Sequence, residues 1–529
     1  MSLALPLGAL APIVLLIAAL AAFRHPGIRP RGVTRLSEAA ALGALALAVA
    51  GVAQNLTGGP ARVALVEGPV AVVLRLDAVS TTMTFLVAFI GWIVLRYSRS
   101  YLDGEPREGR FHGLMLATLA AVLLLMQSGS LSILILAFIG VGIGLRQLQL
   151  FYPDRPAARR AATKFTLVWH AGDAALILAA ALWLGVFGTG EFAALAASAA
   201  EVPSGTGHLA IALIVLAAVL KTAAFPLHGW LTEVMEAPTP VSALLHAGII
   251  NAGGFLLIRT AELVQASSGA MAALVMIGGF TALFGAVVML TQSAVKTALA
   301  WSTVAQMGFL LLQCGLGLWA LALLHIVAHS LYKAHAFLAS GGAVAAVASL
   351  RRPGPVATPG LGAVLKSFGL ALVIYAAMAA LFTALAGPKS PQALALGTML
   401  IFGVAYLVAQ GLADAAPVAL TRRTALAALG AAAGYFTFQM AALAICGPHL
   451  PAAPTPGSLD WALIALAVLS FGLVAFAQAL FPLWAHHPAS AGLRVHLANG
   501  LYLNALLDRL IGGFRVADTD QAKGQTPCS

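Results

Sequence analysis

The chain has 529 residues, of which 61% are hydrophobic and only 9% carry a charged side chain. A soluble domain carries about 25% charged residues, so this composition excludes a soluble globular protein and indicates a polytopic membrane protein. The net charge of +11 gives no reason to expect a nucleic-acid partner, because basic residues also set the orientation of membrane proteins.

Fifteen apolar runs are long enough to cross a bilayer, which takes about 17–25 helical residues. No basic residue precedes the first run, and Arg24 follows it, which favours a retained helix with its N-terminus outside over a cleaved signal peptide. We therefore expect an all-α polytopic membrane protein with 14–15 transmembrane helices. The runs are 3–23, 36–54, 76–97, 112–128, 131–150, 164–188, 208–225, 238–260, 270–290, 295–314, 318–349, 361–386, 392–413, 424–446 and 460–484.

Basic residues gather after the odd-numbered runs, whereas the opposite loops hold few charges. With the N-terminus outside, the basic segments lie in the cytoplasm, as the positive-inside rule requires, and so does the C-terminus. The basic residues concerned are Arg24, Arg29, Arg31, Arg35, Arg96, Arg99, Arg107, Arg110, Arg155, Arg159, Arg160, Lys164, Arg351, Arg352, Arg422 and Arg423.

Prolines interrupt two consecutive runs. Pro226 falls at the end of the seventh run, and Pro238 and Pro240 open the eighth. Broken helices at membrane depth occur where they are buried in protein or line a wet cavity. Paired breaks in the two halves of a chain are typical of transporters.

Ionisable residues inside the apolar runs are candidate functional groups, because a charge at the bilayer centre is costly. His325, His329 and Lys333 recur at i, i+4 and i+8, so they share one helix face. Burial disfavours the charged form of a lysine and a nearby carboxylate favours it, while histidine titrates near neutral pH. Such a series suits a proton relay. The full set is Asp173, Lys221, His246, Lys296, His325, His329, Lys333 and His335.

Other interpretations of the histidine face remain open. Zinc needs a third or fourth ligand, and neither a carboxylate nor a cysteine lies nearby in the sequence; the three cysteines also lack motif spacing. Haem ligation by a histidine pair is possible. Each histidine can also serve structure alone by hydrogen bonding to a neighbouring helix. We expect no metal site in this chain.

The stretch KTAAFPLHGWLTEVMEAPTPVSALLHAGIINAGGFLLIR (221–259) resembles the signature of the NuoL-type antiporter-like subunits of respiratory complex I and Mrp cation antiporters. QSAVKTALAWSTVAQMGFLLL (292–312) and HIVAHSLYKAHAFLASG (325–341) are similar to the next two motifs of that family. The resemblance covers about residues 70–350 and implies two inverted five-helix repeats, each with a broken helix. It divides the chain into N-terminal helices (1–110), a first repeat (111–260), a second repeat (261–415) and C-terminal helices with a short amphipathic tail (416–529).

The same resemblance assigns roles to individual residues. It places the family's proton-translocating lysine at Lys221, its modulating histidine at His246 and its central connecting lysine at Lys296. His325, His329 and Lys333 take the places of the polar residues of a later helix. Lys389 is a weaker match to the lysine of the second broken helix, and His228, beside Pro226, fits an interface or a proton carrier.

Two departures from the family pattern stand out. The family pairs its lysine with a glutamate in a W-E-G-V-G motif, but here Ile139 occupies that register. We expect Asp173 to supply the missing carboxylate. The segment HLANGLYLNALLDRLIGG (496–513) is similar to the one before the lateral helix of complex I, yet no lateral helix is expected after it.

These departures favour the DabB-type membrane subunits of inorganic carbon accumulation complexes. That resemblance implies a proton- or sodium-conducting subunit of the bacterial inner membrane, without a cofactor and not an enzyme by itself. It would energise CO2 hydration to bicarbonate by a large peripheral cytoplasmic DabA-like zinc subunit. The alternatives are a proton-pumping subunit of a complex I-like or membrane hydrogenase redox complex, and a haem or metal enzyme that uses His325 and His329.

Overall fold

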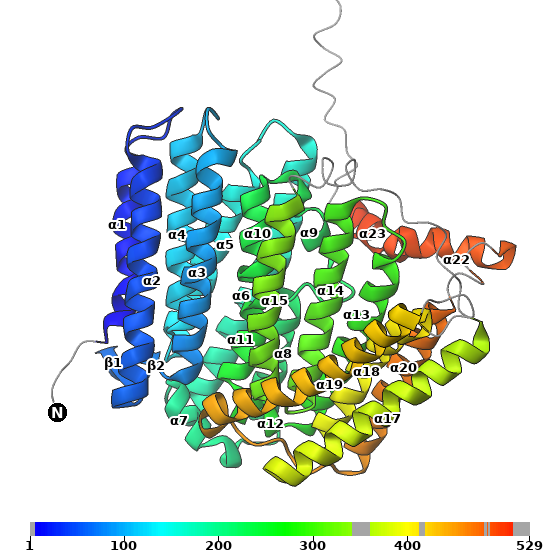
Figure 1. The fold of residues 1–529 in the computed structure, drawn as a ribbon. Helices are drawn as coiled ribbons and strands as arrows, with labels where there is room; N and C mark the ends of the chain where they lie inside the picture. Colours follow the sequence, from blue (N-terminus) through cyan, green and yellow to red (C-terminus); the bar gives the residue numbers. More distant parts are fainter. Residues whose placement is uncertain (1–5, 341–359, 412–417, 481–483, 485–486, 511–529) are drawn as a thin grey trace, which may run out of the picture.

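Long helices that run side by side make up most of the molecule (Figure 1). The computed structural model describes residues 6–340, 360–411, 418–480, 484 and 487–510. Within these residues, 12 helices are long and apolar enough to cross a membrane, and three shorter apolar helices cover Leu7–Phe23, Thr206–Lys221 and Pro391–Ala405. Each predicted run overlaps one of these helices, so the prediction of an all-α polytopic membrane protein is confirmed.

The first half of the chain forms one side of the bundle (Figure 1). Its elements are α1 (Ala11–Phe23), α2 (Val33–Gly58), β1 (Ala61–Val66), β2 (Val72–Leu76), α3 (Ala78–Tyr101), α4 (Glu108–Met126), α5 (Leu131–Gln149), α6 (Pro156–Phe187), α7 (Phe192–Ala197) and α8 (Thr206–Lys221). α6 packs between α5 and α8. An apolar helix satisfies its backbone hydrogen bonds internally, which is what hydrocarbon demands of a spanning segment.

A short antiparallel hairpin of β1 and β2 precedes α3 and was not predicted. It leads directly to Asp77, whose side chain caps α3 by accepting a hydrogen bond from the Ser80 backbone N–H at 2.8 Å. Arg259, at the far end of a later helix, binds the same carboxylate at 2.8 Å. Burial opposes ionisation of Asp77, but Arg259 and Arg75 outweigh it and hold its pKa well below the usual range. The hairpin is thereby fixed to the helix bundle.

The predicted break after Lys221 is present. α8 ends at Lys221, and only short helical turns follow before α10 begins at Thr239, with Pro238 at its N-cap and Pro240 in its first turn. Proline lacks the N–H that a helix interior needs but is accepted in a first turn. The interrupted segment consists of α9 (Gly229–Thr232), η3 (Val234–Glu236), α10 (Thr239–Ala247), η4 (Ile249–Asn251) and α11 (Ala252–Arg259).

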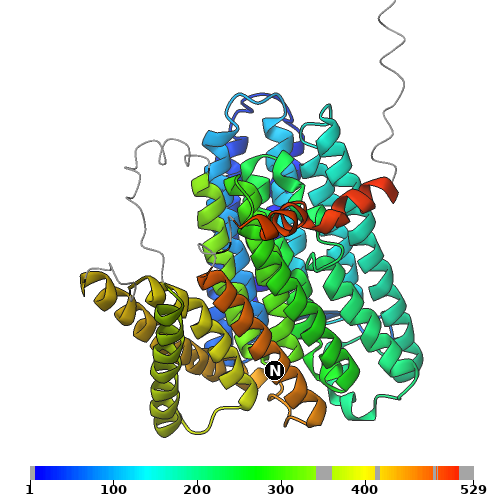
Figure 2. The same cartoon turned by 90° about the vertical axis from the view of Figure 1, so that its right-hand side faces the viewer.

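The remaining helices form the rest of the bundle and an outer group. The bundle helices are α12 (Ala261–Gln265), α13 (Ser268–Met289), α14 (Val295–Gly315) and α15 (Trp319–Ala339), and the later ones are α17 (Leu361–Ala386), α18 (Pro391–Gly411), α19 (Val418–Cys446), α20 (Ser458–Ala479), α22 (Pro488–Ala498) and α23 (Leu503–Leu510). Figure 2 shows α17, α18 and α19 beside the main bundle, while α22 and α23 lie across it near one end.

Several predictions stay open. Lys389 lies in the connection between α17 and α18, and its match to the lysine of the second broken helix remains a prediction. The segment that holds Arg351 and Arg352, and the tail from residue 511, lie outside the described residues. The inverted repeats and the four-part division of the chain remain predictions.

Candidate ion-conduction site

The candidate site contains a buried ion pair between two helices. Lys221, the last residue of α8, is fully buried, and its Nζ donates a hydrogen bond to Asp173 Oδ1 of α6 at 2.6 Å. A second hydrogen bond runs from Nζ to the Trp169 carbonyl oxygen at 3.3 Å. The contact predicted between Lys221 and Asp173 is therefore present, and it offsets the cost of burying either charge alone.

Two aromatic rings complete the surroundings of the ammonium group. Lys221 Nζ lies 4.3 Å from the ring centre of Phe138 and 4.2 Å from that of Trp169. Both distances fall within the range of cation–π attraction. Phe138 immediately precedes Ile139, so α5 supplies an aromatic face from the position next to the one at which a glutamate was expected.

A histidine that the sequence analysis missed also binds the carboxylate. His170 Nδ1 lies 2.8 Å from Asp173 Oδ2, and its side chain is 40% exposed. The two residues stand at i and i+3 on α6, a spacing that brings side chains together on a helix. That spacing was the available signal, since His170 lies in the same predicted run as Asp173.

His246 occupies a separate position behind the helix break. It is fully buried on α10, its Nδ1 lies 3.0 Å from Thr303 Oγ1, and its ring stacks on Phe337 at 4.3 Å. Among the described residues, its hydrogen-bond partner is Thr303 and not Lys221. His246 thus joins α10 to α14 and α15.

The polar face of α15 is present as predicted. His325 Nδ1 bonds to Gln313 Oε1 at 2.8 Å, His329 Nδ1 lies 3.2 Å from Asn251 Oδ1, and Lys333 Nζ donates to the Leu299 carbonyl at 2.9 Å. The centres of the two imidazole rings are 6.0 Å apart. Nε2 of His246, His325 and His329 is buried without a hydrogen-bond partner among the described residues.

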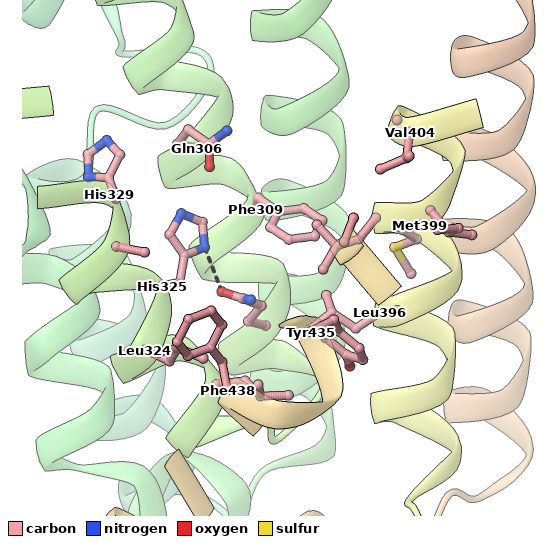
Figure 3. Close-up of a pocket in the computed structure, with 18 of the residues that line it drawn as sticks. Gln306, Phe309, Leu324, His325, His329, Leu396, Met399, Val404, Tyr435 and Phe438 are labelled. Carbon is pink, nitrogen blue, oxygen red and sulfur yellow. Dashed lines mark hydrogen bonds between the residues drawn. The ribbon is translucent and has the colours of Figure 1, made fainter. Parts of the chain in front are cut away.

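A cavity of about 860 Å³ borders this face between α15 and the later helices. Figure 3 shows His325 and Gln306 beside it, opposite Leu396, Met399 and Tyr435. Its walls are otherwise mostly apolar.

Four other predicted residues lie away from the centre. Lys296 is the second residue of α14, partly exposed, and donates to Thr239 Oγ1 at 2.9 Å, so it lies at a helix end and not in mid-span. His335 is exposed on α15. His228 is buried, and the centre of its ring lies 4.8 Å from the ring centre of Trp301. Lys389 lies in a connection, as described above.

A second buried charge cluster was also missed. Lys164 was counted as a cytoplasmic loop charge, but its side chain is fully buried and binds Glu233, Asp508 and Asn504. Glu233 follows α9 inside the interrupted segment, and Asn504 and Asp508 belong to α23. No signal in the sequence links residues this far apart.

The donor set does not favour a metal at the histidines. Within the described ranges, no group of three or more His, Cys, Asp or Glu side chains comes together as a metal site. His325 and His329 are bound to the amide groups of Gln313 and Asn251.

The sequence matches two protein families that share this architecture. Residues 128–353 match the transmembrane region of the NADH:quinone oxidoreductase/Mrp antiporter family, and residues 67–112 match the N-terminus of complex I NADH-ubiquinone oxidoreductase chain 5. The chain is 35% identical over 308 residues to NADH-quinone oxidoreductase subunit L of Mycobacterium tuberculosis, which covers 56% of this chain and 48% of that protein.

Solved structures with the same fold include membrane complexes. A chain of the Mrp complex from Dietzia sp. aligns with a TM-score of 0.65 at 23% identity, covering 98% of this chain and 61% of the matched one. A chain of the membrane-bound sulfane sulfur reductase, an archaeal respiratory membrane complex, aligns with a TM-score of 0.59 at 16% identity. The alignment covers 94% of this chain and 99% of the matched one. These likenesses concern the fold.

Further sequence matches are found among DabB proteins, and one of them covers most of the chain. The chain is 43% identical over 268 residues to the probable inorganic carbon transporter subunit DabB of Hydrogenovibrio crunogenus, or 50% of this chain and 52% of that protein. It is 39% identical over 468 residues to the probable inorganic carbon transporter subunit DabB2 of Halothiobacillus neapolitanus, or 86% of this chain and 83% of that protein. The chain therefore belongs to the family of antiporter-like membrane subunits and, within it, to the DabB group.

Proposed function

We propose that this chain is the proton-conducting membrane subunit of an inorganic carbon accumulation complex. The observation that carries the proposal is the buried ion pair of Lys221 and Asp173 at a helix break. A lysine that shares its proton with a neighbouring carboxylate can be charged or neutral at little cost, because the pair has no net charge. Broken helices place such groups at ion sites in transporters.

The interior polar groups supply the continuation of the path. His246, His329 and His325 each keep a free ring nitrogen in the bundle interior, and Lys333 adds a second buried ammonium on the same helix face. Histidine exchanges protons near neutral pH. In this proposal protons pass between Lys221 and the α15 face, and sodium is the alternative cation.

The relatives support a partner that acts on inorganic carbon. The DabB relatives are named as subunits of inorganic carbon transporters, so we propose that proton flow through this chain drives CO2 hydration by a peripheral cytoplasmic zinc protein. The zinc would belong to that partner. The complex would lie in the bacterial inner membrane, with the N-terminus outside and the C-terminus in the cytoplasm, since the predicted basic segments then face the cytoplasm.

Replacement of Lys221 tests the proposal. The chain is expressed with its cytoplasmic partner in a host that cannot grow in air without inorganic carbon uptake, and labelled bicarbonate uptake is measured. Lys221→Ala is expected to abolish uptake at normal protein level. Lys366→Ala, which changes an exposed lysine on α17, is the matched control and is expected to leave uptake unchanged. Normal uptake by Lys221→Ala would contradict proton conduction through this lysine.

A second candidate is a proton-pumping subunit of a redox complex. It is favoured by the 35% identity to NADH-quinone oxidoreductase subunit L over 308 residues. The two candidates predict different partners. Purification of the native complex should yield one large zinc protein under the first proposal, and flavin or iron–sulfur subunits under the second.

A further inference from the structure

The carboxylate of Asp173 is shared by two nitrogen groups. Its Oδ1 accepts a hydrogen bond from Lys221 Nζ at 2.6 Å, and its Oδ2 lies 2.8 Å from His170 Nδ1. The Lys221 side chain is fully buried, whereas that of His170 is 40% exposed. The carboxylate therefore connects the buried ammonium group with an imidazole at the edge of the bundle.

His170 occupies an unusual place for a polar residue. It lies within one turn of the midpoint of the 32-residue helix α6, next to the exposed apolar residues Leu167 and Ala171. An ionisable group at this depth is costly and indicates function by default. The imidazole also packs closely on α5, because a Cβ added to Gly142 would lie 3.4 Å from His170 Cε1.

We propose that His170 is a positioning residue of the Lys221 site that holds Asp173 and shares its negative charge with Lys221. The inference rests on the proposed proton conduction through Lys221. The hydrogen bond from His170 Nδ1–H fixes the carboxylate, and Nε2 of the 40% exposed side chain is the nitrogen that takes up a proton.

The charges around Asp173 explain why His170 and Lys221 would share its single negative charge. α6 contributes Asp173 and His170, α8 contributes Lys221, and α5 contributes the uncharged ring of Phe138 and the side-chain-free Gly142. One carboxylate neutralises one cation, and a low-dielectric interior disfavours a second. When His170 Nε2 gains a proton, Lys221 Nζ loses one to the next group of the proposed path. One N–H bond forms, one breaks, and the cluster stays neutral.

Two substitutions separate positioning from charge sharing. In His170→Asn, the side-chain amide can still donate a hydrogen bond to Asp173 but cannot take up a proton, whereas His170→Leu removes both properties. His208→Asn is the matched control, because His208 is exposed in the first turn of α8, at the far end from Lys221. Full-length variants are expressed with the cytoplasmic partner, and protein level and bicarbonate uptake are measured across external pH.

We expect His170→Leu to lower uptake by about tenfold, the order of effect of one interaction with a charged partner, and His170→Asn, which keeps the hydrogen bond, to lower uptake less. His170→Asn should also weaken the dependence of uptake on external pH, because the amide cannot take up a proton, while His208→Asn keeps the wild-type profile. If His170→Leu fails to fold, the uptake and pH profile of His170→Asn alone test the proposal.

The outcomes distinguish this inference from the proposed function. If Lys221→Ala abolishes uptake but His170→Asn matches the wild type in rate and pH profile, His170 has only a structural role and the inference is wrong. If Lys221→Ala retains normal uptake, the proposed function itself fails, and the role of His170 in it fails too.

Discussion

Lys164 Nζ on α6 lies 2.6 Å from Asp508 Oδ1 on α23, in a fully buried position. The same ammonium donates to Asn504 Oδ1 at 2.7 Å, and Asn504 Nδ2 donates to Glu233 Oε1 at 2.6 Å. Glu233 lies in the interrupted segment between Lys221 and His246. The cluster therefore ties α23 to the segment that follows the buried ion pair.

Removal of Lys164 should loosen this attachment. Lys164→Met leaves Glu233 and Asp508 without their shared cation, and loss of one partner from a buried ion pair costs about 3–5 kcal/mol. We expect a lower thermal unfolding temperature in detergent and faster proteolysis within α22 and α23. Arg159→Met, which changes an exposed neighbour on α6, is the control. Equal behaviour of the two variants would show that the cluster does not hold α23.

The helices were predictable because one physical constraint fixes them. A segment that crosses hydrocarbon must be apolar over about 20 residues, and runs such as 270–290 carry that signal within themselves. The hairpin of β1 and β2 escaped because it is short and lies between two such runs. Its signal was the turn sequence Glu67–Gly68–Pro69 between two stretches rich in valine, a pattern typical of a hairpin.

The site was predictable only in part. Asp173 could be paired with Lys221 because it is a carboxylate within an apolar run, and a buried lysine needs an opposite charge. The partners of Lys164 could not be predicted, because Asp508 lies on the last described helix and nothing in the local sequence relates it to α6. Tertiary packing alone decides such contacts.

Neutralisation of Asp173 should be as harmful as loss of Lys221. Asp173→Asn removes the charge that offsets the buried ammonium, so Lys221 loses its proton or its position. We expect bicarbonate uptake to fall to the level of Lys221→Ala, with normal protein level. Asp154→Asn, in the exposed loop before α6, should behave like the wild type. Retained uptake in Asp173→Asn would remove this residue from the proposed path.

Close packing of α13 on α14 should make the stability of the protein sensitive to added side-chain atoms at this interface. A Cβ added to Gly308 would lie 2.7 Å from the Gly278 carbonyl oxygen, whereas one added to Gly279 meets no atom within 4 Å. Overpacking of a tight interface costs about 1–3 kcal/mol. Gly308→Ala should therefore lower the thermal unfolding temperature, and Gly279→Ala should not. A similar loss in both would point to helix flexibility and not to packing as the cause.

Acid should weaken the end of the bundle that carries the hairpin. Arg62 of β1 binds Glu191, before α7, at 2.6 Å, and this hydrogen bond holds the pKa of Glu191 below its usual range. A carboxylate with a lowered pKa in the folded state stabilises it above the unfolded pKa, about 4.3, and loses that effect as pH falls through the folded value. The wild type should lose thermal stability in that window, while Glu191→Gln, which lacks the charge at every pH, should lose less. High salt should shrink the difference, because Arg62 is half exposed and screening weakens such pairs. If the two proteins lose stability in parallel below pH 4.3, the attachment of the hairpin does not depend on this ion pair.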